Sequence, residues 1–314
     1  MNIIKMHHPY KKADIPNGDI VLALGFFDGV HKGHQQVIKT AKKIANEKQL
    51  KLAVMTFNQH PSIVFKKVHP EEIKYLSTIE RKEELIAELG VDILYEVDFT
   101  SSFASLSPQQ FVDQYIVGLR AKVAVAGFDY TFGKKEVASM EHLPSYAHNR
   151  FEVVTVGELT DQDKKISSTR IREAMDQGRM SQVNELLGYT YAVPGVVIHG
   201  DARGRTLGYP TANIDIDSSI RLPKTGVYAV EIKIGQQWHT GMASIGYNIT
   251  FETNRQLTVE INIFDFKKDI YGEQVMVKWY KRLRDEKKFP SVSALIEQLK
   301  QDEKETRHFF EHRH

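Results

Sequence analysis

The sequence predicts an α/β protein: a doubly wound parallel sheet, followed by a smaller antiparallel β-barrel domain with a C-terminal helix. Two observations carry this prediction. Strand-like apolar runs alternate with helical patterns up to about residue 188, as in a parallel sheet with helices on both faces. Beyond that point short strands follow one another with turn residues between them, which is typical of an antiparallel barrel. We therefore predict two domains, residues 1–187 and 188–314.

The first half of the chain contains five buried-strand patterns, at residues 20–24, 51–57, 91–99, 121–128 and 151–156. Apolar residues recur at helical spacing from near His34 onward. Ser77–Glu80 has the spacing of a capping box before a helix that ends near Leu89. Ser107 and Pro108 place a cap and a proline at the start of another helix. Ligands bind such sheets beyond the carboxyl ends of the strands.

The second half is predicted to consist mainly of strands. They lie at residues 192–198, 226–234, 238–246, 257–264 and 274–280. One clear helix follows, over residues 291–310. The C-terminal run RHFFEHRH is rich in histidine, and we interpret it as the polar end of this helix.

Composition narrows the class of protein. The 314 residues include 42 basic and 40 acidic side chains, a balance too even for a protein that coats nucleic acid or an anionic membrane. There is no cysteine, so disulfides, thiolate catalysis and cysteine-ligated zinc are excluded. No apolar run approaches the roughly 20 residues that span a bilayer, and the first residues lack the apolar stretch of a signal peptide. We expect a cytoplasmic enzyme, monomeric or weakly homo-oligomeric, with no nucleic-acid or membrane partner.

The stretch GFFDGVHKGH, residues 25–34, joins the first strand to the first helix. Its glycines allow a tight turn and close approach of a ligand to the backbone. A helix that starts near His34 would direct free amide groups and the positive end of its dipole into the same space. His31 and His34 are three residues apart and could form a structural pair or a metal pair, although a third metal ligand is missing nearby. The combined context favours a pair beside a bound phosphate.

Two further stretches support a phosphate site. ISSTRIREAM, from Ile166, places hydroxyls at a helix start with Arg170 and Arg172 in the first turn. A hydroxyl can simply cap the helix, but cations at this end oppose the helix dipole, and arginines that grip a polyphosphate explain them better. GFDYTFG, residues 127–133, follows a strand and carries Asp129; the alternative is a plain loop.

Four stretches, GFFDGVHKGH, TFNQHP, GFDYTFG and ISSTRIR, resemble the signatures of the adenylyltransferase module of prokaryotic FAD synthetases, within the HxGH nucleotidyltransferase superfamily. HxGH by itself is moderately specific, whereas four motifs in the right order are strong. The resemblance implies that the phosphate of FMN attacks the α-phosphorus of ATP, which releases pyrophosphate and forms FAD. Such a reaction needs alignment and neutralisation of developing charge, not a protein nucleophile.

The resemblance also implies roles for individual residues. His31 and His34 would face the α and β phosphates, and Arg172 would act with them in catalysis. ATP would be bound by Gly25, Phe27, Gly33, Ser168 and Thr169. The flavin would lie near Phe57, His60 and Asp129. Mg²⁺ would bridge phosphate oxygens, because it prefers hard oxygen ligands.

The stretch GDARGRTLGYPTAN, residues 200–213, is the densest motif of the second half. A basic hairpin turn is one interpretation. The PTAN run instead resembles the riboflavin kinase module that is fused to these synthetases, as do LPKTGVYAV, DFKKDIYG and RLRDEKKF. This resemblance implies that Gly204, Thr211 and Asn213 bind ATP, and that Thr211 and Asn213 also hold Mg²⁺. Glu260 would be the base that accepts the proton of the ribityl hydroxyl, a task that suits a carboxylate.

Four positions depart from the riboflavin kinase pattern: Ser244, Asn248, Ile249 and Asn262 stand for asparagine, arginine, proline and histidine. Because these changes lie near the expected base, we expect riboflavin phosphorylation to be weaker than FMN adenylylation. The alternative is a monofunctional FAD synthetase whose kinase-like barrel is inactive or regulatory. A flavin- or RNA-binding regulator without turnover is a third hypothesis, which the intact motifs and the near-neutral charge disfavour.

Overall fold

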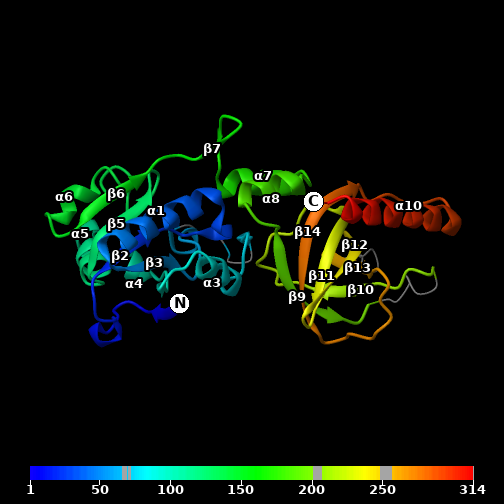
Figure 1. Cartoon of the computed structure of the whole chain (residues 1–314), viewed down its shortest axis with the longest axis horizontal. Coiled ribbons are helices and arrows are strands. Elements are labelled where there is room, and N and C mark those ends of the chain that lie inside the picture. Colours follow the sequence, from blue (N-terminus) through cyan, green and yellow to red (C-terminus); the bar gives the residue numbers. More distant parts are fainter. Residues whose placement is uncertain (66–68, 70–71, 201–206, 248–256, 314) are drawn as a thin grey trace. The chain divides into compact units, whose positions relative to one another are not determined.

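The computed structural model describes residues 1–65, 69, 72–200, 207–247 and 257–313. The chain divides into two compact units, Met1–Ser168 and Thr169–His314 (Figure 1). The first contains a six-stranded parallel sheet with helices, and the second contains a closed antiparallel barrel with a C-terminal helix, so the predicted fold class is confirmed. Within the described ranges, no helix is both long and apolar enough to cross a bilayer.

The sheet of the first unit has the strand order β1-β4-β3-β2-β5-β6. The strands are β1 (Asn2–Met6), β2 (Ile20–Leu24), β3 (Lys51–Phe57), β4 (Ile93–Val97), β5 (Ala121–Gly127) and β6 (Glu152–Val156). All but β1 were predicted; β1 is an edge strand with Met6 as its one buried residue, so it has no buried apolar run. The chain goes from β2 to β3 on one side and later to β5 on the other. The carboxyl end of β2 is therefore a topological switch point, where such sheets bind ligands.

The helices of the first unit are mostly short. They are α1 (Lys32–Lys48), α2 (Ser62–Phe65), α3 (Ile79–Glu88), α4 (Ser101–Ala104), α5 (Pro108–Phe111) and α6 (Leu143–Ala147), with a π-helical turn at Val112–Val117 and a two-stranded hairpin of β7 (Thr160–Asp161) and β8 (Lys164–Lys165). The capping box predicted at the start of α5 is confirmed, because Ser107 and Gln110 bond to each other's backbone amides.

The cap predicted at Ser77 is wrong by one residue. Thr78 caps α3 by accepting a hydrogen bond from the amide of Arg81. The hydroxyl of Ser77 is engaged elsewhere, because it accepts from the amide of Gly29, 3.2 Å away. A tertiary contact thus takes the side chain that the local pattern assigned to the helix start.

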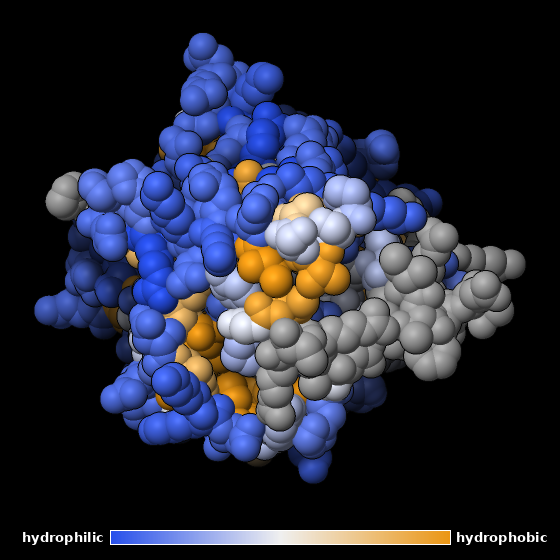
Figure 2. Space-filling model, turned by 90° about the vertical axis from the view of Figure 1, so that its right-hand side faces the viewer, coloured by the Kyte–Doolittle hydropathy of each residue, from blue (hydrophilic) through white to orange (hydrophobic). Residues whose placement is uncertain are grey.

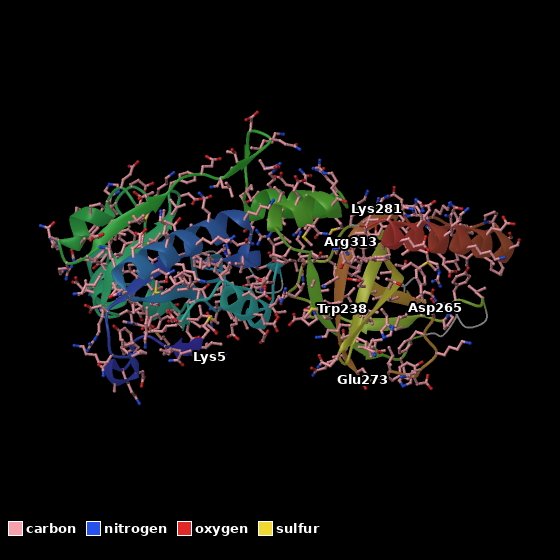
Figure 3. All side chains as sticks on the ribbon, in the orientation of Figure 1. Lys5, Trp238, Asp265, Glu273, Lys281 and Arg313 are labelled. Carbon is pink, nitrogen blue, oxygen red and sulfur yellow. The ribbon has the colours of Figure 1, made fainter. Side chains whose placement is uncertain are left out.

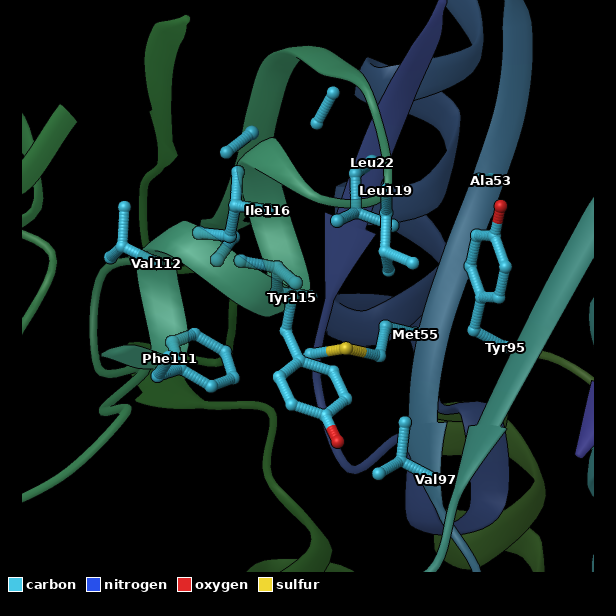
Figure 4. Close-up of a cluster of buried hydrophobic side chains, with 14 of the residues drawn as sticks. Leu22, Ala53, Met55, Tyr95, Val97, Phe111, Val112, Tyr115, Ile116 and Leu119 are labelled. Carbon is cyan, nitrogen blue, oxygen red and sulfur yellow. The ribbon is translucent and has the colours of Figure 1, made fainter. Parts of the chain in front are cut away.

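One face of the sheet packs against a cluster of large apolar side chains (Figure 4). Alternate strand residues such as Leu22, Met55 and Tyr95 meet Phe111 and Tyr115 from the helical segment that precedes β5. Burial of one such side chain contributes about 1.5–3 kcal/mol. Helix α1 packs on β2, β3 and β5 with a separate set of buried residues, which are Val37, Ile38, Ala41 and Ala45. Helices therefore cover both faces, as predicted.

The barrel of the second unit closes in the order β10-β13-β12-β11-β14-β9. Its strands are β9 (Ala192–Ile198), β10 (Ala212–Asp215), β11 (Gly226–Ile234), β12 (Gln237–Tyr247), β13 (Leu257–Ile263) and β14 (Gln274–Arg284). Five of them were predicted. β10 was missed because it is four residues long and lies inside a run of glycine and polar residues. Figure 2 shows apolar surface among hydrophilic side chains on a face of this unit.

Helices α7 (Ser168–Asp176) and α8 (Met180–Leu187) fall in the second unit, apart from Ser168. Arg221 donates to the carboxylate of Asp176 at 2.6 Å, and Asn184 donates to the carbonyl of Trp279 at 2.9 Å. These bonds join both helices to the barrel unit. The domain boundary after residue 187 remains a prediction.

The C-terminal helix α10 (Val292–Glu311) is confirmed, with Ser291 as its cap. Its buried Asp302 accepts from Arg284 of β14 at 2.7 Å. Farther along, Arg307 donates to Asp265 at 2.9 Å; Figure 3 labels Asp265. The ion pairs tie the helix to the barrel at two points.

Candidate active sites

The turn between β2 and α1 holds a backbone conformation that L residues rarely adopt. Phe27 has φ of +54° and the β-branched Val30 has φ of +37°, with Gly29 at +73° between them. The conformations of Phe27 and Val30 cost about 1–3 kcal/mol each and persist where surrounding contacts impose them, whereas glycine adopts a positive φ readily. One contact here is the amide of Leu76, which donates to Asp28 at 2.9 Å. Strained turns of this kind cluster at functional sites.

The two histidines predicted to lie beside a phosphate form a stacked pair. Their ring centroids are 3.6 Å apart, and the ring planes differ by 17°. His31 is the cap of α1, and its Nδ1 accepts from the amide of His34. Nδ1 is therefore the acceptor, so Nε2 carries the proton of a neutral His31 ring. Gly33 is needed here, because a Cβ at this position would lie 3.2 Å from the His31 ring.

Helix α1 begins at Lys32, two residues before the position that the sequence suggested. The helix is 17 residues long, and the aligned peptide dipoles give its N-terminus a partial positive charge. This end lies at the histidine pair, where it can bind an anion. Gly25 lies against the Phe27 ring, since a Cβ there would come within 2.7 Å of it. Phe27 also packs edge-on against His34 at 5.3 Å.

The electrostatic environment of His34 is unusual. Burial lowers its pKa well below the ordinary value, and the positive groups of His31, Lys82 and Lys165 add to the effect. The Nδ1 atom of His34 is buried and has no hydrogen-bond partner among the described residues. A neutral ring surrounded by cationic groups forms a suitable binding site for a phosphate anion.

The residues expected on the flavin side lie after β3 and β5. The Phe57 side chain is in the core and packs against Phe99 at 5.0 Å. His60 is half-buried; its Nδ1 lies 2.6 Å from the hydroxyl of Ser62, and its ring meets Phe26 edge-on. Asp129 is exposed and pairs with Lys165 at 2.5 Å. The three residues lie at the carboxyl ends of β3 and β5, the two strands that flank β2.

The ISSTRIR motif starts helix α7, as the sequence indicated. The hydroxyl of Ser168 donates to the carbonyl of Asp28 at 3.2 Å, which brings it to the histidine turn. Thr169 and Arg172 belong to the second unit. Their predicted roles in ATP binding and catalysis remain predictions.

The barrel brings together the residues assigned to the kinase reaction. The hydroxyl of Thr211 donates to Glu260 at 3.2 Å, and Asn213 pairs with Glu260 in the register of β10 and β13. Gly200 permits this arrangement, because a Cβ there would lie 2.0 Å from the Asn213 amide. Gly204 lies outside the described residues.

Two of the four departures from the kinase pattern can be placed. Asn262 is buried, and its Nδ2 donates to the carbonyl of Pro210, at the start of the PTAN run, 2.8 Å away. Ser244 of β12 lies opposite Glu260 of β13. Asn248 and Ile249 lie outside the described residues. Asn262 therefore supports the segment that carries Thr211.

A cavity of about 400 Å³ adjoins Thr211. Its walls combine apolar side chains with two lysines and one aspartate. Its lining includes Val197, Pro210, Thr211, Ala212, Ile261, Ile263, Phe266, Lys267, Lys268, Asp269, Ile270 and Tyr271. An apolar cleft with a few polar groups is the usual form of a small-molecule site.

Sequence reasoning missed Lys82, Lys165 and Ser77, all of which lie at the first site. Lys82 is buried and donates to backbone carbonyls there. Lys165 immediately precedes the ISSTRIR motif in the sequence. Its positive charge beside a predicted phosphate site is the one signal that could have identified it. In the sequence, Ser77 has the pattern of an ordinary helix cap and Lys82 that of an ordinary helix residue.

Two family models match the chain, one described as FAD synthetase over residues 14–170 and one described as riboflavin kinase over residues 187–310. A bifunctional riboflavin kinase/FMN adenylyltransferase of Listeria monocytogenes is 51% identical over 99% of this chain and 98% of its own length. The Bacillus subtilis protein of the same name is 45% identical over the same shares. A crystal structure described as a macrolide-efflux protein from Streptococcus pneumoniae has a TM-score of 0.90 at 42% identity and covers 98% of this chain and 99% of that one. That description differs from the other names, but the fold is shared.

Proposed function

Because the chain belongs to the family of bifunctional riboflavin kinase/FMN adenylyltransferases, we propose how its two units divide the work. The protein is an enzyme of flavin-cofactor biosynthesis that uses ATP, riboflavin and FMN. Adenylyl transfer to FMN takes place at the histidine turn, and phosphorylation of riboflavin takes place in the barrel. The stacked pair of His31 and His34 at the N-terminus of α1 is the observation that carries the first assignment.

Adenylyl transfer forms a bond between a phosphate oxygen of FMN and the α-phosphorus of ATP, while the bond to pyrophosphate breaks. Negative charge on the transferring group is met by the N-terminus of α1 and by His31, whose Nε2 carries the proton because Nδ1 accepts from the His34 amide. His34 is neutral in the free enzyme because its pKa is lowered. Donors that are fixed in advance stabilise the transition state without reorganisation.

Gly25, Phe27, Gly33 and Ser168 of the first unit bind ATP in this proposal. Thr169 and Arg172 keep the roles that the resemblance gave them. The flavin of FMN lies near Phe57, His60 and Asp129. Of these groups, Phe57 ends β3 and His60 follows it, whereas Asp129 follows β5. Adjacent strand ends thus present the two substrates to each other across the switch point.

In the barrel, Glu260 accepts the proton of the ribityl 5′-hydroxyl as the hydroxyl oxygen bonds to the γ-phosphorus of ATP, while the bond from that phosphorus to ADP breaks and ADP leaves. Thr211 donates to Glu260 at 3.2 Å, which orients the carboxylate for this task. The cavity beside Thr211 accommodates the adenosine part of ATP, with apolar walls for the base and Lys267 and Lys268 near the phosphates. Glu260, Thr211 and the cavity form one connected site.

The donor atoms near Glu260 fit Mg²⁺, which prefers hard oxygen ligands. Thr211 and Asn213 would hold the ion through a hydroxyl and an amide oxygen. When bound, Mg²⁺ neutralises charge on the phosphate oxygens of ATP. Asn213 is positioned by β10 and its pairing with β13, and Thr211 immediately precedes β10.

The alternative of a silent barrel is not favoured, because Thr211, Asn213 and Glu260 stand together and the relatives above are named for both activities. The cytoplasmic location, the monomeric or weakly oligomeric state and the lack of a nucleic-acid or membrane partner remain predictions.

One experiment tests both assignments. Purified protein is incubated with ATP and Mg²⁺, separately with FMN and with riboflavin, and the flavins are separated by chromatography. We expect FAD and pyrophosphate from FMN, and FMN from riboflavin. Absence of FAD in the first reaction would overturn the role of the histidine turn, and absence of FMN in the second would overturn that of the barrel.

A further inference from the structure

Lys82 of α3 is a buried lysine with an unusual set of partners. Its side chain is 4% exposed, and lysines are almost never buried without a compensating arrangement. Its Nζ donates to the carbonyl oxygens of Phe26 at 3.2 Å and Phe57 at 3.1 Å, and to the hydroxyl of Thr56 at 3.3 Å. Three donors thus meet three acceptors.

The acceptors belong to two neighbouring strand ends. Phe26 follows β2 and precedes the histidine turn, whereas Phe57 ends β3 and precedes the segment with His60. Thr56 also donates to the Phe26 carbonyl at 2.8 Å. Lys82 therefore joins the backbone that leads to the ATP side with the backbone that leads to the flavin side.

Residues 75–77, shortly before Lys82 in the chain, also connect the two loops. The amide of Gly29 donates to Ser77, and the amide of Leu76 donates to Asp28, both in the histidine turn. On the other side, the amide of His60 donates to the hydroxyl of Tyr75 at 3.0 Å. The segment 75–82 contacts both loops, and Lys82 is its charged end.

We propose that Lys82 is a positioning residue for adenylyl transfer: it sets the spacing between the histidine turn, which faces ATP, and residues 57–62, which face the flavin. This rests on the proposed function. An attacking phosphate and an α-phosphorus brought by two separate loops react only when the loops are in register, and a misplacement of about 1 Å can cost about 100-fold in rate. Lys82 touches neither substrate in this role.

The substitution Lys82→Met tests the proposal, because it keeps the length of the side chain and removes the three hydrogen bonds. We expect kcat for FAD formation to fall by about 10- to 100-fold, with a much smaller change in KM for ATP and FMN. Thr56→Val removes the Thr56 bond to the Phe26 carbonyl and one of the three acceptors of Lys82 with little change of shape, and it should give a smaller fall of the same kind. Lys42→Met is the matched control, since Lys42 also donates to a carbonyl, that of Leu89, but contacts neither loop.

The pH profile separates positioning from mere stability. Burial lowers the pKa of Lys82 to about 8, although the negative charges of Asp28, Glu96 and Glu83 act to raise it. His34 is a further titratable group that faces Lys82. As pH rises through this value, the amine keeps two donors for three acceptors, so wild-type kcat should decline. Lys82→Arg keeps its charge, and it should restore part of the kcat lost in Lys82→Met and lack this decline.

The outcomes are distinct. If wild-type protein forms no FAD, the proposed function fails. If it forms FAD and folded Lys82→Met or Thr56→Val keeps the wild-type kcat and pH profile, the positioning role is overturned. Should Lys82→Met not fold, Thr56→Val and Lys82→Arg decide the question by the same two readouts.

Discussion

The side chain of Asn262 donates a hydrogen bond to the carbonyl oxygen of Pro210 across a distance of 2.8 Å. Asn262 belongs to β13, two residues beyond Glu260, and Pro210 opens the PTAN run. The bond holds the segment with Thr211 beside the strand that carries the expected base. A residue that departs from the kinase pattern thus has a structural task at the site.

Replacement of Asn262 should therefore impair the kinase. In Asn262→Leu the Pro210 carbonyl loses this donor, and we expect riboflavin phosphorylation to fall by about tenfold or more because the segment with Thr211 is no longer fixed. FMN adenylylation, measured on the same preparation, should be unchanged. Equal rates of FMN formation in variant and wild type would show that the bond does not position the site.

The histidine pair should be essential for FAD formation. His31→Ala or His34→Ala removes a group that faces the phosphates, and we expect kcat to fall by about 100-fold or more. His312→Ala is the control, because His312 is exposed at the end of α10. FAD formation is followed by chromatography. Near wild-type turnover in both variants would contradict the assignment.

His34 should make the protein sensitive to acid. Its pKa is lowered by burial and by neighbouring positive groups. Below the ordinary pKa of histidine, the unfolded state therefore binds a proton at this side chain and the folded state does not. Stability is then highest above the ordinary pKa of about 6.5 and is lost as pH falls below it. Thermal unfolding at pH 7.5 and pH 5 should show a larger drop for wild type than for His34→Asn. Parallel drops in the two proteins would refute the expectation.

Glu260 should be the base of the kinase reaction. Glu260→Gln keeps the shape and removes the proton acceptor, so we expect riboflavin phosphorylation to fall by at least about 100-fold. Glu273→Gln is the matched control, because Glu273 is exposed on the same unit (Figure 3). Binding of ATP to the variant, measured by calorimetry, should persist. Retained turnover would assign the base to another residue.

Short-range patterns in the sequence predicted much of the fold. Ser107 and Gln110 form the expected capping box, because its partners lie three residues apart. The strands in the middle of the sheet were predicted from buried apolar runs, whereas β1 and β10 were not, since an edge strand and a four-residue strand have no such run.

In the candidate sites, too, local relationships could be predicted from the sequence and long-range ones could not. The pairing of His31 with His34 could be predicted, because a helix start brings residues three apart together. The bond from Thr211 to Glu260 joins residues 49 positions apart, and only the register of β10 and β13 places them side by side. The motifs could name candidate residues for these sites, but they could not describe the geometry.

The sequence by itself determined the two modules, their order and the candidate residues for the chemistry, because helix starts, strand runs and motifs are local. Only the tertiary structure decided that Ser77 bonds to Gly29 instead of capping α3, and that Lys82 joins Phe26 to Phe57. Those partners are 25 to 56 residues apart in the chain. Which carbonyl a buried ammonium group meets depends on how the strands and α3 pack, and no local pattern specifies that.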